Sequence, residues 1–437
     1  MSSPAGREAF PVIQIALDFL ELDRAVRLAH EAVAGGADWL EAGTPLLKSE
    51  GLNAVRRLRK EFPDRTIVAD LKTMDAGRIE VEMAAKAGAD IAVVLGAASE
   101  STIRQCIEAG KSYGCRIYVD TIGLDDPAAR AREAEAWGAD YVGVHLPVDE
   151  QMRGGSGLET LRAVAGAVTL PVAAAGGINS ETAPAMVDAG AAIIIVGGAV
   201  HKAPDATAAT QAIRTALDTK QAVASELFKR GGADAIRQTL QKVSSSNLSD
   251  ALHRGGVLPG IRCWTPGRKL VGRALTVRTA PGDWAKPVQA IDRAEPGDVL
   301  VIDAGGVPPA IWGACATQSA EGRGLAGVVI HGCLRDIDEV REGALPVFAT
   351  DVVPHAGEPK GHGEIGQPVV LGGRRVETGD WILGDGCGVV HLPHPQAVEY
   401  ANRAQDVLET ENRIHAEIGQ GSTLGQVAQL LRWERQG

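Results

Sequence analysis

One repeating unit dominates the first half of the chain and limits the folds that it can adopt. A short apolar run is followed by a helical segment rich in Ala, Glu, Lys and Arg, and strands that alternate with helices in this way lie parallel. The runs are residues 12–18, 39–43, 66–72, 91–96, 116–123, 141–147, 171–177 and 192–198. Eight such units predict an α/β fold with a closed (β/α)8 TIM barrel, and an open doubly wound sheet is the structural alternative.

The pattern changes after the barrel. Residues 218–245 keep a helical pattern without strands, and three serines at 244–246 mark a break before the next module, so we expect a helical linker at 218–245. From 246 to 395 strand candidates are separated by Gly and Pro turns, with few helices, which predicts a second α/β domain. Residues 396–437 predict a C-terminal helical extension. The barrel domain itself is expected to cover residues 1–217.

Charge and apolar content limit the partners of the chain. The net charge of −11 over 437 residues argues against a non-specific nucleic-acid binder, which usually carries a basic patch. No apolar run approaches the roughly 18 residues that a membrane span needs, and the start of the chain lacks a signal core. The six cysteines form no CxxC pair, so neither a zinc site nor a disulfide framework is expected. We therefore expect a cytoplasmic protein that binds neither nucleic acid nor membranes.

Ionisable residues end several of the predicted barrel strands, where this fold places its catalytic groups. These residues are Asp18, Glu41, Asp70, Lys72, Asp120 and His145. A structural cap or a loop salt bridge would explain any one of them alone. Their occurrence together on several strands favours an active site at this end of the barrel.

The segment DLKTMD, residues 70–75, has an informative spacing. Side chains alternate along a strand, so Asp70 and Lys72 are predicted to point the same way, while Asp75 falls at the start of the next helix. Glu41 and Asp70 come from adjacent strands, and their hard oxygen ligands suit Mg²⁺, with substrate oxygens and water completing its shell. The sequence thus predicts a cation beside an ammonium group.

Paired glycines follow the last two strands of the predicted barrel. Gly176 and Gly177 end the seventh run, and Gly197 and Gly198 end the eighth. Glycine lets backbone N–H groups approach a phosphate closely, and phosphate binds at this place in many such barrels. Either pair alone could be a tight turn, whereas both pairs together favour phosphate binding.

The first domain resembles the 3-hexulose-6-phosphate synthases of the orotidine-5′-phosphate decarboxylase superfamily, from about Val12 to Leu217. The segments that carry the resemblance are QIALD (14–18), EAGTPLLKSEG (41–51), ADLKTMDAG (69–77), AAGGI (174–178) and IVGGAV (195–200). The related 3-keto-gulonate-6-phosphate decarboxylases are the near alternative. The segment after His145, LPVDEQMRGG, differs from the sequence expected at this place in the family.

The resemblance implies an aldehyde-lyase. The reaction would be aldol addition of formaldehyde to the phosphorylated sugar D-ribulose 5-phosphate, giving D-arabino-hex-3-ulose 6-phosphate, or its reverse. Glu41 and Asp70 would hold Mg²⁺, or Mn²⁺ in its place, and the substrate phosphate would lie at the strand 7 and 8 glycines. The resemblance also implies a dimer in which Asp75 reaches into the neighbouring subunit's site.

A mechanism follows as a hypothesis. A base removes a C1 proton, and Mg²⁺ stabilises the resulting cis-enediolate. Lys72 and Asp75 assist with charge and proton handling. His145 is the candidate for proton transfer, because its unperturbed pKa lies near neutrality. Asp18 would position a substrate hydroxyl or Lys72.

The second domain carries an Arg-Asp pair at the end of an apolar strand, Arg335 and Asp336. A strand-end ion pair would explain this pair, and so would a site for a metal and an anion. Over residues 246–393 the domain resembles the RNase E activity regulator-like family, which includes 4-hydroxy-4-methyl-2-oxoglutarate aldolases. Its markers are SNLSDAL (246–252), AEPGDVLVIDAGG (294–306), GEPKGHGEIGQPVVLGG (357–373) and GDWILGDGCGVV (379–390).

This second resemblance implies a swivelling β/β/α fold, trimeric packing, a divalent metal at Asp336 and substrate at Arg335. Enzymes of the family usually carry an acidic residue 21 positions before the Arg, and here that position is Ala314. Two classes of role therefore stay open for this domain, a residual aldolase or decarboxylase and a regulatory binding protein. A hexamer would satisfy both a dimeric barrel and a trimeric partner domain.

Overall fold

The computed structural model describes residues 10–428, which divide into two compact units. The first unit contains the residues up to 151, residues 155–230 and those from 409 onward. The second contains residues 152–154 and 231–408. Each unit is described by itself.

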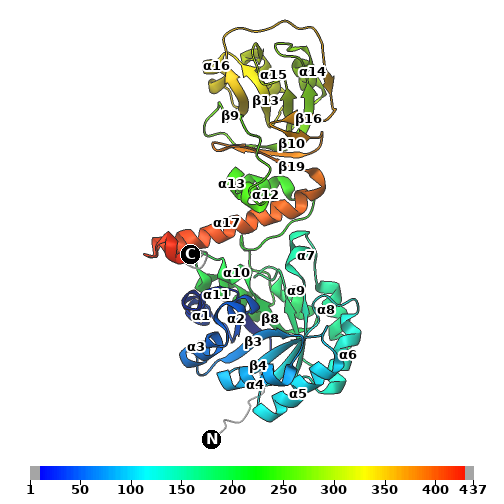
Figure 1. Cartoon of the computed structure of the whole chain (residues 1–437), viewed down its shortest axis with the longest axis vertical. Coiled ribbons are helices and arrows are strands. Elements are labelled where there is room, and N and C mark those ends of the chain that lie inside the picture. The colour runs from blue at the N-terminus through cyan, green and yellow to red at the C-terminus, as the bar shows by residue number, and fades with distance from the viewer. Residues whose placement is uncertain (1–9, 429–437) are drawn as a thin grey trace, which may run out of the picture. The chain divides into compact units, whose positions relative to one another are not determined.

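The first unit is a closed barrel of parallel strands, in which β8 pairs with β1 to complete the ring (Figure 1). The strands are β1 (Val12–Leu17), β2 (Trp39–Ala42), β3 (Thr66–Thr73), β4 (Ile91–Leu95), β5 (Arg116–Asp120), β6 (Tyr141–His145), β7 (Val172–Ala175) and β8 (Ala191–Val196). Each of the eight predicted runs overlaps one of these strands, and only β3 and β8 extend one residue beyond their runs. The TIM-barrel prediction is confirmed, and the open sheet is excluded.

Helices surround the barrel. They are α1 (Leu22–Ala34), α2 (Thr44–Glu50), α3 (Asn53–Glu61), α4 (Gly77–Ala87), α5 (Glu100–Tyr113), α6 (Pro127–Trp137), α7 (Val148–Met152), α8 (Leu158–Ala165), α9 (Ala183–Asp188), α10 (Gly198–His201) and α11 (Ala206–Thr219). Gly88, Gly114 and Gly138 end α4, α5 and α6 in the left-handed conformation, which glycine adopts without steric cost.

Two apolar layers hold the barrel together. Residues such as Ile15, Leu40 and Ile67 point outward and form one core with the helices. A second, separate cluster includes Trp39, Tyr118 and Tyr141. Its members are the strand residues whose side chains point to the opposite face of the strands. Because every strand is covered on both faces, the runs are apolar throughout, as parallel barrel strands require.

The prediction of a helical linker at 218–245 is wrong in its middle. Helix α11 ends at Thr219, followed by Lys220 in the left-handed conformation, and the next helix, α12 (Ile236–Lys242), begins sixteen residues later. Several backbone groups between them bond to other parts of the structure, for example Val223 N–H to the Ser180 carbonyl of the barrel at 3.1 Å. Tertiary contacts override the helical periodicity of these residues.

The predicted C-terminal extension is helical as far as the structure describes it. It contains α17 (Ala397–Gly419) and α18 (Leu424–Val427). The part of this prediction that concerns residues 429–437 lies outside the described residues.

The second unit is built on a mixed sheet in the order β19-β18-β10-β11-β13-β14-β9. Its strands are β9 (Arg262–Cys263), β10 (Leu270–Arg278), β11 (Asp298–Asp303), β12 (Ala310–Trp312), β13 (Gly327–Leu334), β14 (Val347–Val352), β15 (Glu364–Ile365), β18 (Trp381–Asp385) and β19 (Gly388–Leu392), with β16 (Val369–Leu371) and β17 (Arg374–Val376) as a separate pair. The helices are α13 (Ser245–Ala251), α14 (Ala285–Arg293), α15 (Ala314–Gly322), α16 (Ile337–Glu342) and the 3₁₀ turn η1 (His394–Gln396). The predicted α/β class is confirmed here too.

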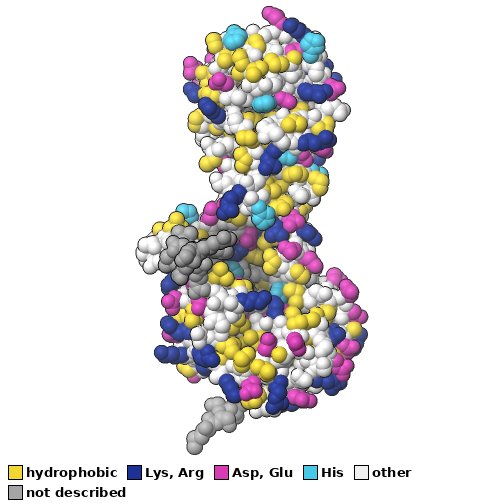
Figure 2. Space-filling view, in the orientation of Figure 1, with side chains coloured by type: hydrophobic (Ala, Val, Ile, Leu, Met, Phe, Trp, Pro, Cys, Tyr) yellow, Lys and Arg dark blue, Asp and Glu magenta, His cyan; other side chains and the backbone are white. Residues whose placement is uncertain are grey.

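The surface of the barrel unit carries charges of both signs. On the face that Figure 2 shows, acidic and basic side chains lie interspersed over the barrel. Within residues 10–428, none of the helices combines the length and the apolar character that crossing a bilayer requires.

Candidate active site

The charged residues at the strand ends meet around Lys72. Its Nζ lies 3.0 Å from Asp70 Oδ2 and 3.2 Å from Asp120 Oδ2. Burial lowers the pKa of Lys72, but the charges of Asp70 and Asp120 outweigh it and raise the pKa above its usual value. Lys72 is therefore a fixed ammonium ion in this site rather than a base.

Lys72 reaches this position through an unusual backbone. Its φ of 47° is left-handed, and the pairing of β3 with β4 shifts register between Ala69 and Thr73. Asp70 and Lys72 converge as predicted, but a simple alternation of side chains is not the reason. An irregular strand end re-aims the lysine, at a cost of about 1–3 kcal/mol that the surrounding structure must offset.

Three carboxyl groups face one another beside this lysine, from Asp18, Glu41 and Asp70. Burial, then the negative charges of Asp70 and Asp18, raise the pKa of Glu41 well above its ordinary value. Asp18 keeps part of its surface exposed, yet the protein around it and the charge of Asp70 raise its pKa to about 6. The site therefore gathers more negative charge than Lys72 alone neutralises.

Two neutral side chains fix the carboxylates. Gln14 donates to Glu41 Oε2 at 2.5 Å from inside the barrel. Thr44, the first residue of α2, donates to Asp70 Oδ2 at 2.7 Å. The carboxylate of Asp18 lies where a Cβ at residue 43 would be, so a side chain at Gly43 would displace it. These contacts hold the three acids in place beside Lys72.

A divalent cation fits the Glu41–Asp70 pair by its chemistry. Both residues supply hard oxygen donors, and a cation between them would relieve the repulsion that raises the pKa of Glu41. Among residues 10–428, no group of three or more His, Cys, Asp and Glu side chains is arranged to hold a metal ion. Two carboxylates nevertheless suffice for Mg²⁺ where substrate and water oxygens complete its shell. The Mg²⁺ or Mn²⁺ site stays a prediction.

Asp120 links Lys72 to His145. His145 Nδ1 lies 3.3 Å from Asp120 Oδ2, the same oxygen that contacts Lys72. Burial raises the pKa of Asp120, but its contacts with His145 and Lys72 outweigh this and lower the pKa below the usual value. A carboxylate that stays ionised orients the imidazole ring, and a neutral His145 that donates through Nδ1 presents Nε2 to a substrate.

The four predicted phosphate-binding glycines lie at two adjacent turns. Gly176 and Gly177 have φ values of 100° and 72°, which other residues adopt only with strain. Gly197 lies next to Asp18, since a Cβ there would be 3.6 Å from Asp18 Oδ2. The Gly197 turn thus borders the carboxylate of Asp18, while Gly176 and Gly177 lie beside Leu146 and Gln151. Phosphate binding itself stays a prediction.

Asp75 lies outside the cluster. Its carboxylate is exposed on the loop between β3 and α4, where it accepts the Ala76 N–H at 2.7 Å. Among the described residues no ion pair joins it to Lys72. The exposed apolar side chains of Met74, Ile79 and Met83 lie on the same loop and helix. The role of Asp75 in a neighbouring subunit's site stays a prediction.

The second unit has a pocket at the predicted Arg-Asp pair. It has a volume of about 250 Å³ and is lined by Trp284, Val288, Ala310, Ile311, Trp312, Gly313, Cys315, Ala316, Arg335, Asp336 and Ala356. Arg335 and Asp336 form an ion pair at 3.4 Å, and Asp336 accepts the backbone N–H of Ala314 at 3.2 Å. The methyl side chain of Ala314 adds no ligand. The roles of the pair stay a prediction.

Comparison with known proteins agrees with this geometry. A family model described as orotidine 5′-phosphate decarboxylase / HUMPS matches residues 11–213. The 3-hexulose-6-phosphate synthase of Mycobacterium gastri is 41% identical over 205 residues, which cover 47% of this chain and 99% of that protein. This chain belongs to the orotidine 5′-phosphate decarboxylase / HUMPS family. The prediction that its barrel is an enzyme of this family is confirmed.

Other proteins and a second family model also match parts of the chain. The 3-hexulose-6-phosphate synthase of Methylomonas aminofaciens is 44% identical over 201 residues, or 46% of this chain and 96% of that protein. A crystal structure of a 3-hexulose-6-phosphate synthase is 40% identical, covers 47% of this chain and 99% of that one, and has a TM-score of 0.46. A model described as RraA-like, Aldolase/RraA, matches residues 245–391. The chain is therefore a HUMPS-family barrel fused to an RraA-like domain, as predicted.

The sequence alone left several site residues of this HUMPS-family barrel without a role. Gln14, Thr44 and Asp120 lie in or beside marked segments, and their contacts with Glu41, Asp70 and Lys72 appear only in the folded barrel. Lys202 was missed altogether. It follows α10 directly and lies close enough to Asp18 for its charge to lower that pKa. A lysine four residues after the second glycine pair was the available signal.

Proposed function

We propose that the barrel catalyses the aldol addition of formaldehyde to D-ribulose 5-phosphate, giving D-arabino-hex-3-ulose 6-phosphate, or the reverse cleavage. The observation that carries this proposal is the continuous chain of charged groups from Asp70 through Lys72 and Asp120 to His145. It lies in a barrel that is 41% identical to a 3-hexulose-6-phosphate synthase along nearly the whole of that protein.

Each residue of the site has its own role in this reaction. A proton leaves C1 of the sugar phosphate, C1 forms a bond to the carbon of formaldehyde, and the aldehyde oxygen takes up a proton. His145, oriented by Asp120, is placed to move one of these protons through Nε2. Lys72 holds a positive charge beside the site and stabilises negative charge on the reacting oxygens. Asp18 accepts a hydrogen bond from a substrate hydroxyl.

Glu41 and Asp70 would hold the divalent cation. When bound there, Mg²⁺ supplies Lewis-acid polarisation of the substrate keto oxygen. Hydrogen bonds from Gln14 and Thr44 orient the two carboxylates, and a hydrogen bond from Lys72 holds Asp70. The Gly176–Gly177 and Gly197–Gly198 turns would bind the phosphate through backbone N–H groups.

The proposed active form is at least a dimer. Asp75 is exposed and makes no ion pair with Lys72 of its own chain among the described residues. The exposed apolar side chains of Met74, Ile79 and Met83 lie on the same loop and helix. Ile79 and Met83 lie four residues apart and share one face of α4. A partner barrel on this face would cover the apolar side chains and receive Asp75.

For the second domain we propose a regulatory or architectural role with at most residual aldolase activity. Asp336 already accepts the Ala314 N–H and pairs with Arg335, so its carboxylate has protein partners. Ala314 lacks the oxygen that could hold or activate a metal-bound water.

The deciding experiment measures formaldehyde-dependent loss of ribulose 5-phosphate with Mg²⁺. Turnover by the wild-type chain, together with loss of turnover in Lys72→Ala, would support the proposal. Absence of this turnover, with decarboxylation of 3-keto-gulonate 6-phosphate instead, would replace it with the decarboxylase reaction.

A further inference from the structure

A short segment, residues 223–230, lies beyond the residues that match the HUMPS family, which end at 213, yet it belongs to the barrel unit. Leu227 and Phe228 pack against the apolar core between the strands and helices of the barrel. This segment, called the strap below, is an addition to the family barrel rather than a free connection.

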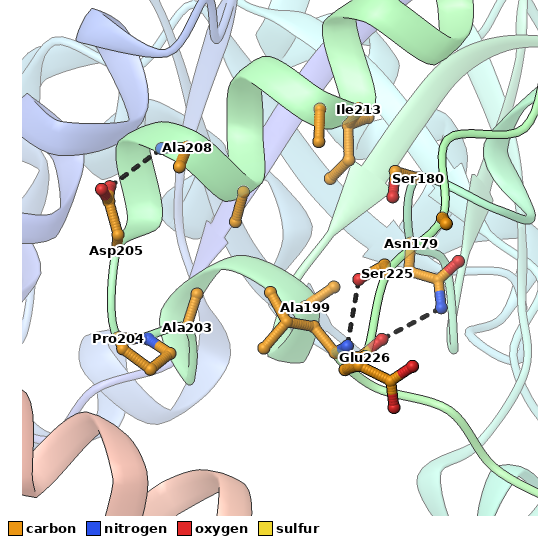
Figure 3. A pocket seen from close by; sticks show the side chains of 14 residues that line it. Asn179, Ser180, Ala199, Ala203, Pro204, Asp205, Ala208, Ile213, Ser225 and Glu226 are labelled. Carbon is orange, nitrogen blue, oxygen red and sulfur yellow. Dashed lines mark hydrogen bonds between the residues drawn. The ribbon is translucent and has the colours of Figure 1, made fainter.

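Hydrogen bonds fasten the strap to the loop that follows the first glycine pair. Ser180 Oγ donates to the Val223 carbonyl at 2.8 Å, and Asn179 Nδ2 donates to the Leu227 carbonyl at 3.1 Å. The Ser225 N–H donates to Glu181 at 2.9 Å. Figure 3 shows Asn179, Ser180 and Ser225 side by side at a cavity of about 340 Å³, which α10 and α11 help to line. The strap thus holds the loop only two residues beyond Gly177.

A buried ion pair fixes the end of the strap. Glu409 of α17 accepts the Phe228 N–H at 3.0 Å and pairs with the Arg230 guanidinium at 2.8 Å. Phe228 has a left-handed φ of 53°, a conformation that an aromatic residue adopts only where its surroundings enforce it. The position of the Phe228 ring is therefore set by Glu409 and Arg230.

The ring of Phe228 lies against the second glycine pair. A Cβ at Gly198 would overlap the ring, whereas a Cβ at Gly197 would lie beside Asp18 on the catalytic side. The Lys202 ammonium lies 5.9 Å from the centre of the Phe228 ring, and the Arg230 guanidinium lies 4.1 Å from it. The ring thus lies between the Gly197–Gly198 turn and the ammonium group of Lys202.

We propose that Phe228 is a positioning residue for the substrate phosphate, holding the Gly197–Gly198 turn in place and steering the Lys202 ammonium toward the bound phosphate monoester. This inference rests on the proposed function, because it takes the glycine turns as the phosphate site. A cation held by an aromatic face keeps one position, and a fixed positive charge beside backbone N–H groups favours a dianion.

The test compares Phe228→Leu, which keeps apolar bulk but removes the aromatic face, with Phe228→Tyr, which keeps both. We expect Phe228→Leu to weaken binding of ribulose 5-phosphate and raise its KM by about five- to tenfold, with kcat nearly unchanged. Phe228→Tyr should stay close to the wild type. Phe62→Leu makes the same substitution elsewhere in the barrel core and should also leave KM unchanged.

Calorimetric binding of ribulose 5-phosphate to the full chain separates this inference from the proposed reaction. Weaker binding by Phe228→Leu in a protein that lacks aldol turnover would reject the reaction and support the role of Phe228. Unchanged or tighter binding by Phe228→Leu would overturn the role, and so would equal weakening by Phe228→Tyr. Thermal unfolding of all three variants checks that each is folded when it is measured.

Discussion

Asp120 at the end of β5 lies 3.2 Å from the ammonium group of Lys72 at the end of β3. Two strands that are not neighbours in the barrel are thereby connected across its open end. Because the same carboxylate also contacts His145, removal of its charge should disturb both the ammonium ion and the proton carrier. This relationship gives the first prediction.

Asp120→Asn should lower kcat for formaldehyde addition by about 10²- to 10⁴-fold, the range that positioned acid–base groups contribute. The amide cannot stabilise a protonated His145, and it leaves Lys72 with one counter-charge fewer. Steady-state kinetics with ribulose 5-phosphate and Mg²⁺ measures the effect. Asp125→Asn removes the same charge from the exposed loop after β5 and serves as the control. Equal rates in the two variants would contradict the assigned role.

The pKa of Asp18, raised to about 6, predicts an acid limb in the pH–rate profile. If the ionised carboxylate binds a substrate hydroxyl, kcat/KM should rise as pH increases through about 6. Asp18→Asn should be slower and should lose this limb. A profile for Asp18→Asn that retains the limb would assign it to another group.

The raised pKa of Asp18 also makes the stability of the folded protein depend on pH. The folded pKa of Asp18 lies above its unfolded value of 3.8, so the folded state binds the proton more tightly. The contribution of Asp18 is fully present below pH 3.8 and is lost as pH rises through about 6. Without divalent cations, Asp18→Asn should therefore gain thermal stability relative to the wild type above pH 6. If the difference in thermal stability between the two proteins is the same at pH 4 and pH 8, this prediction is wrong.

Mg²⁺ should stabilise the chain against unfolding because it relieves repulsion between Glu41 and Asp70. At ten times its dissociation constant we expect the thermal midpoint of the barrel to rise by about 3–6 °C. Glu41→Gln should lose most of this shift, while Glu61→Gln, a change on the surface of α3, should keep it. Differential scanning calorimetry with Mg²⁺ and with a chelator measures the shift. An identical response in both variants would place the cation elsewhere.

Shared active sites predict complementation between inactive subunits. Lys72→Ala and Asp75→Ala chains, produced together in equal amounts, should recover about a quarter of wild-type activity, because half of the random dimers contain one intact site. Each variant alone should be nearly inactive. If the mixture is no more active than each variant alone, Asp75 does not act across subunits.

In the second domain, cleavage of 4-hydroxy-4-methyl-2-oxoglutarate should be weak or absent, because Ala314 provides no acidic side chain at the pocket of Arg335 and Asp336. Product formation by the full chain, compared with Asp336→Ala, tests this. Robust activity in the wild type that disappears in the variant would show that the domain is a working aldolase.

The barrel was predictable from sequence because its regularity is local. Each strand is a short apolar run, several helices end at a glycine, and eight repeats leave few other topologies. The strand-end residues were predictable for the same reason, since parallel strands bring their carboxyl ends together. The order of residues along the chain was therefore enough to place Asp70 and Lys72 in one site.

The remaining features depend on contacts between distant residues. The left-handed φ of Lys72 needs the irregular pairing of β3 with β4, which its sequence does not signal. Residues 220–235 have a helical pattern, but their backbone groups find partners at Ser180, Glu181 and Glu409. The link from Asp120 to Lys72 likewise joins β5 to β3, two strands that do not pair with each other and whose end residues meet only in the folded barrel.

The barrel unit is discontinuous along the chain, because its part from Glu409 onward is separated from the rest by residues 231–408. Arg413 pairs with Glu31, and Arg24 with Glu417, so α17 is tied to α1. During synthesis the ribosome needs about 10–35 s to make the intervening residues, at about 5–20 residues per second. The strap therefore lacks Glu409 while the second domain is being made, and the hydrogen bond from the Phe228 N–H to Glu409 can form only after all of residues 231–408 have been synthesised.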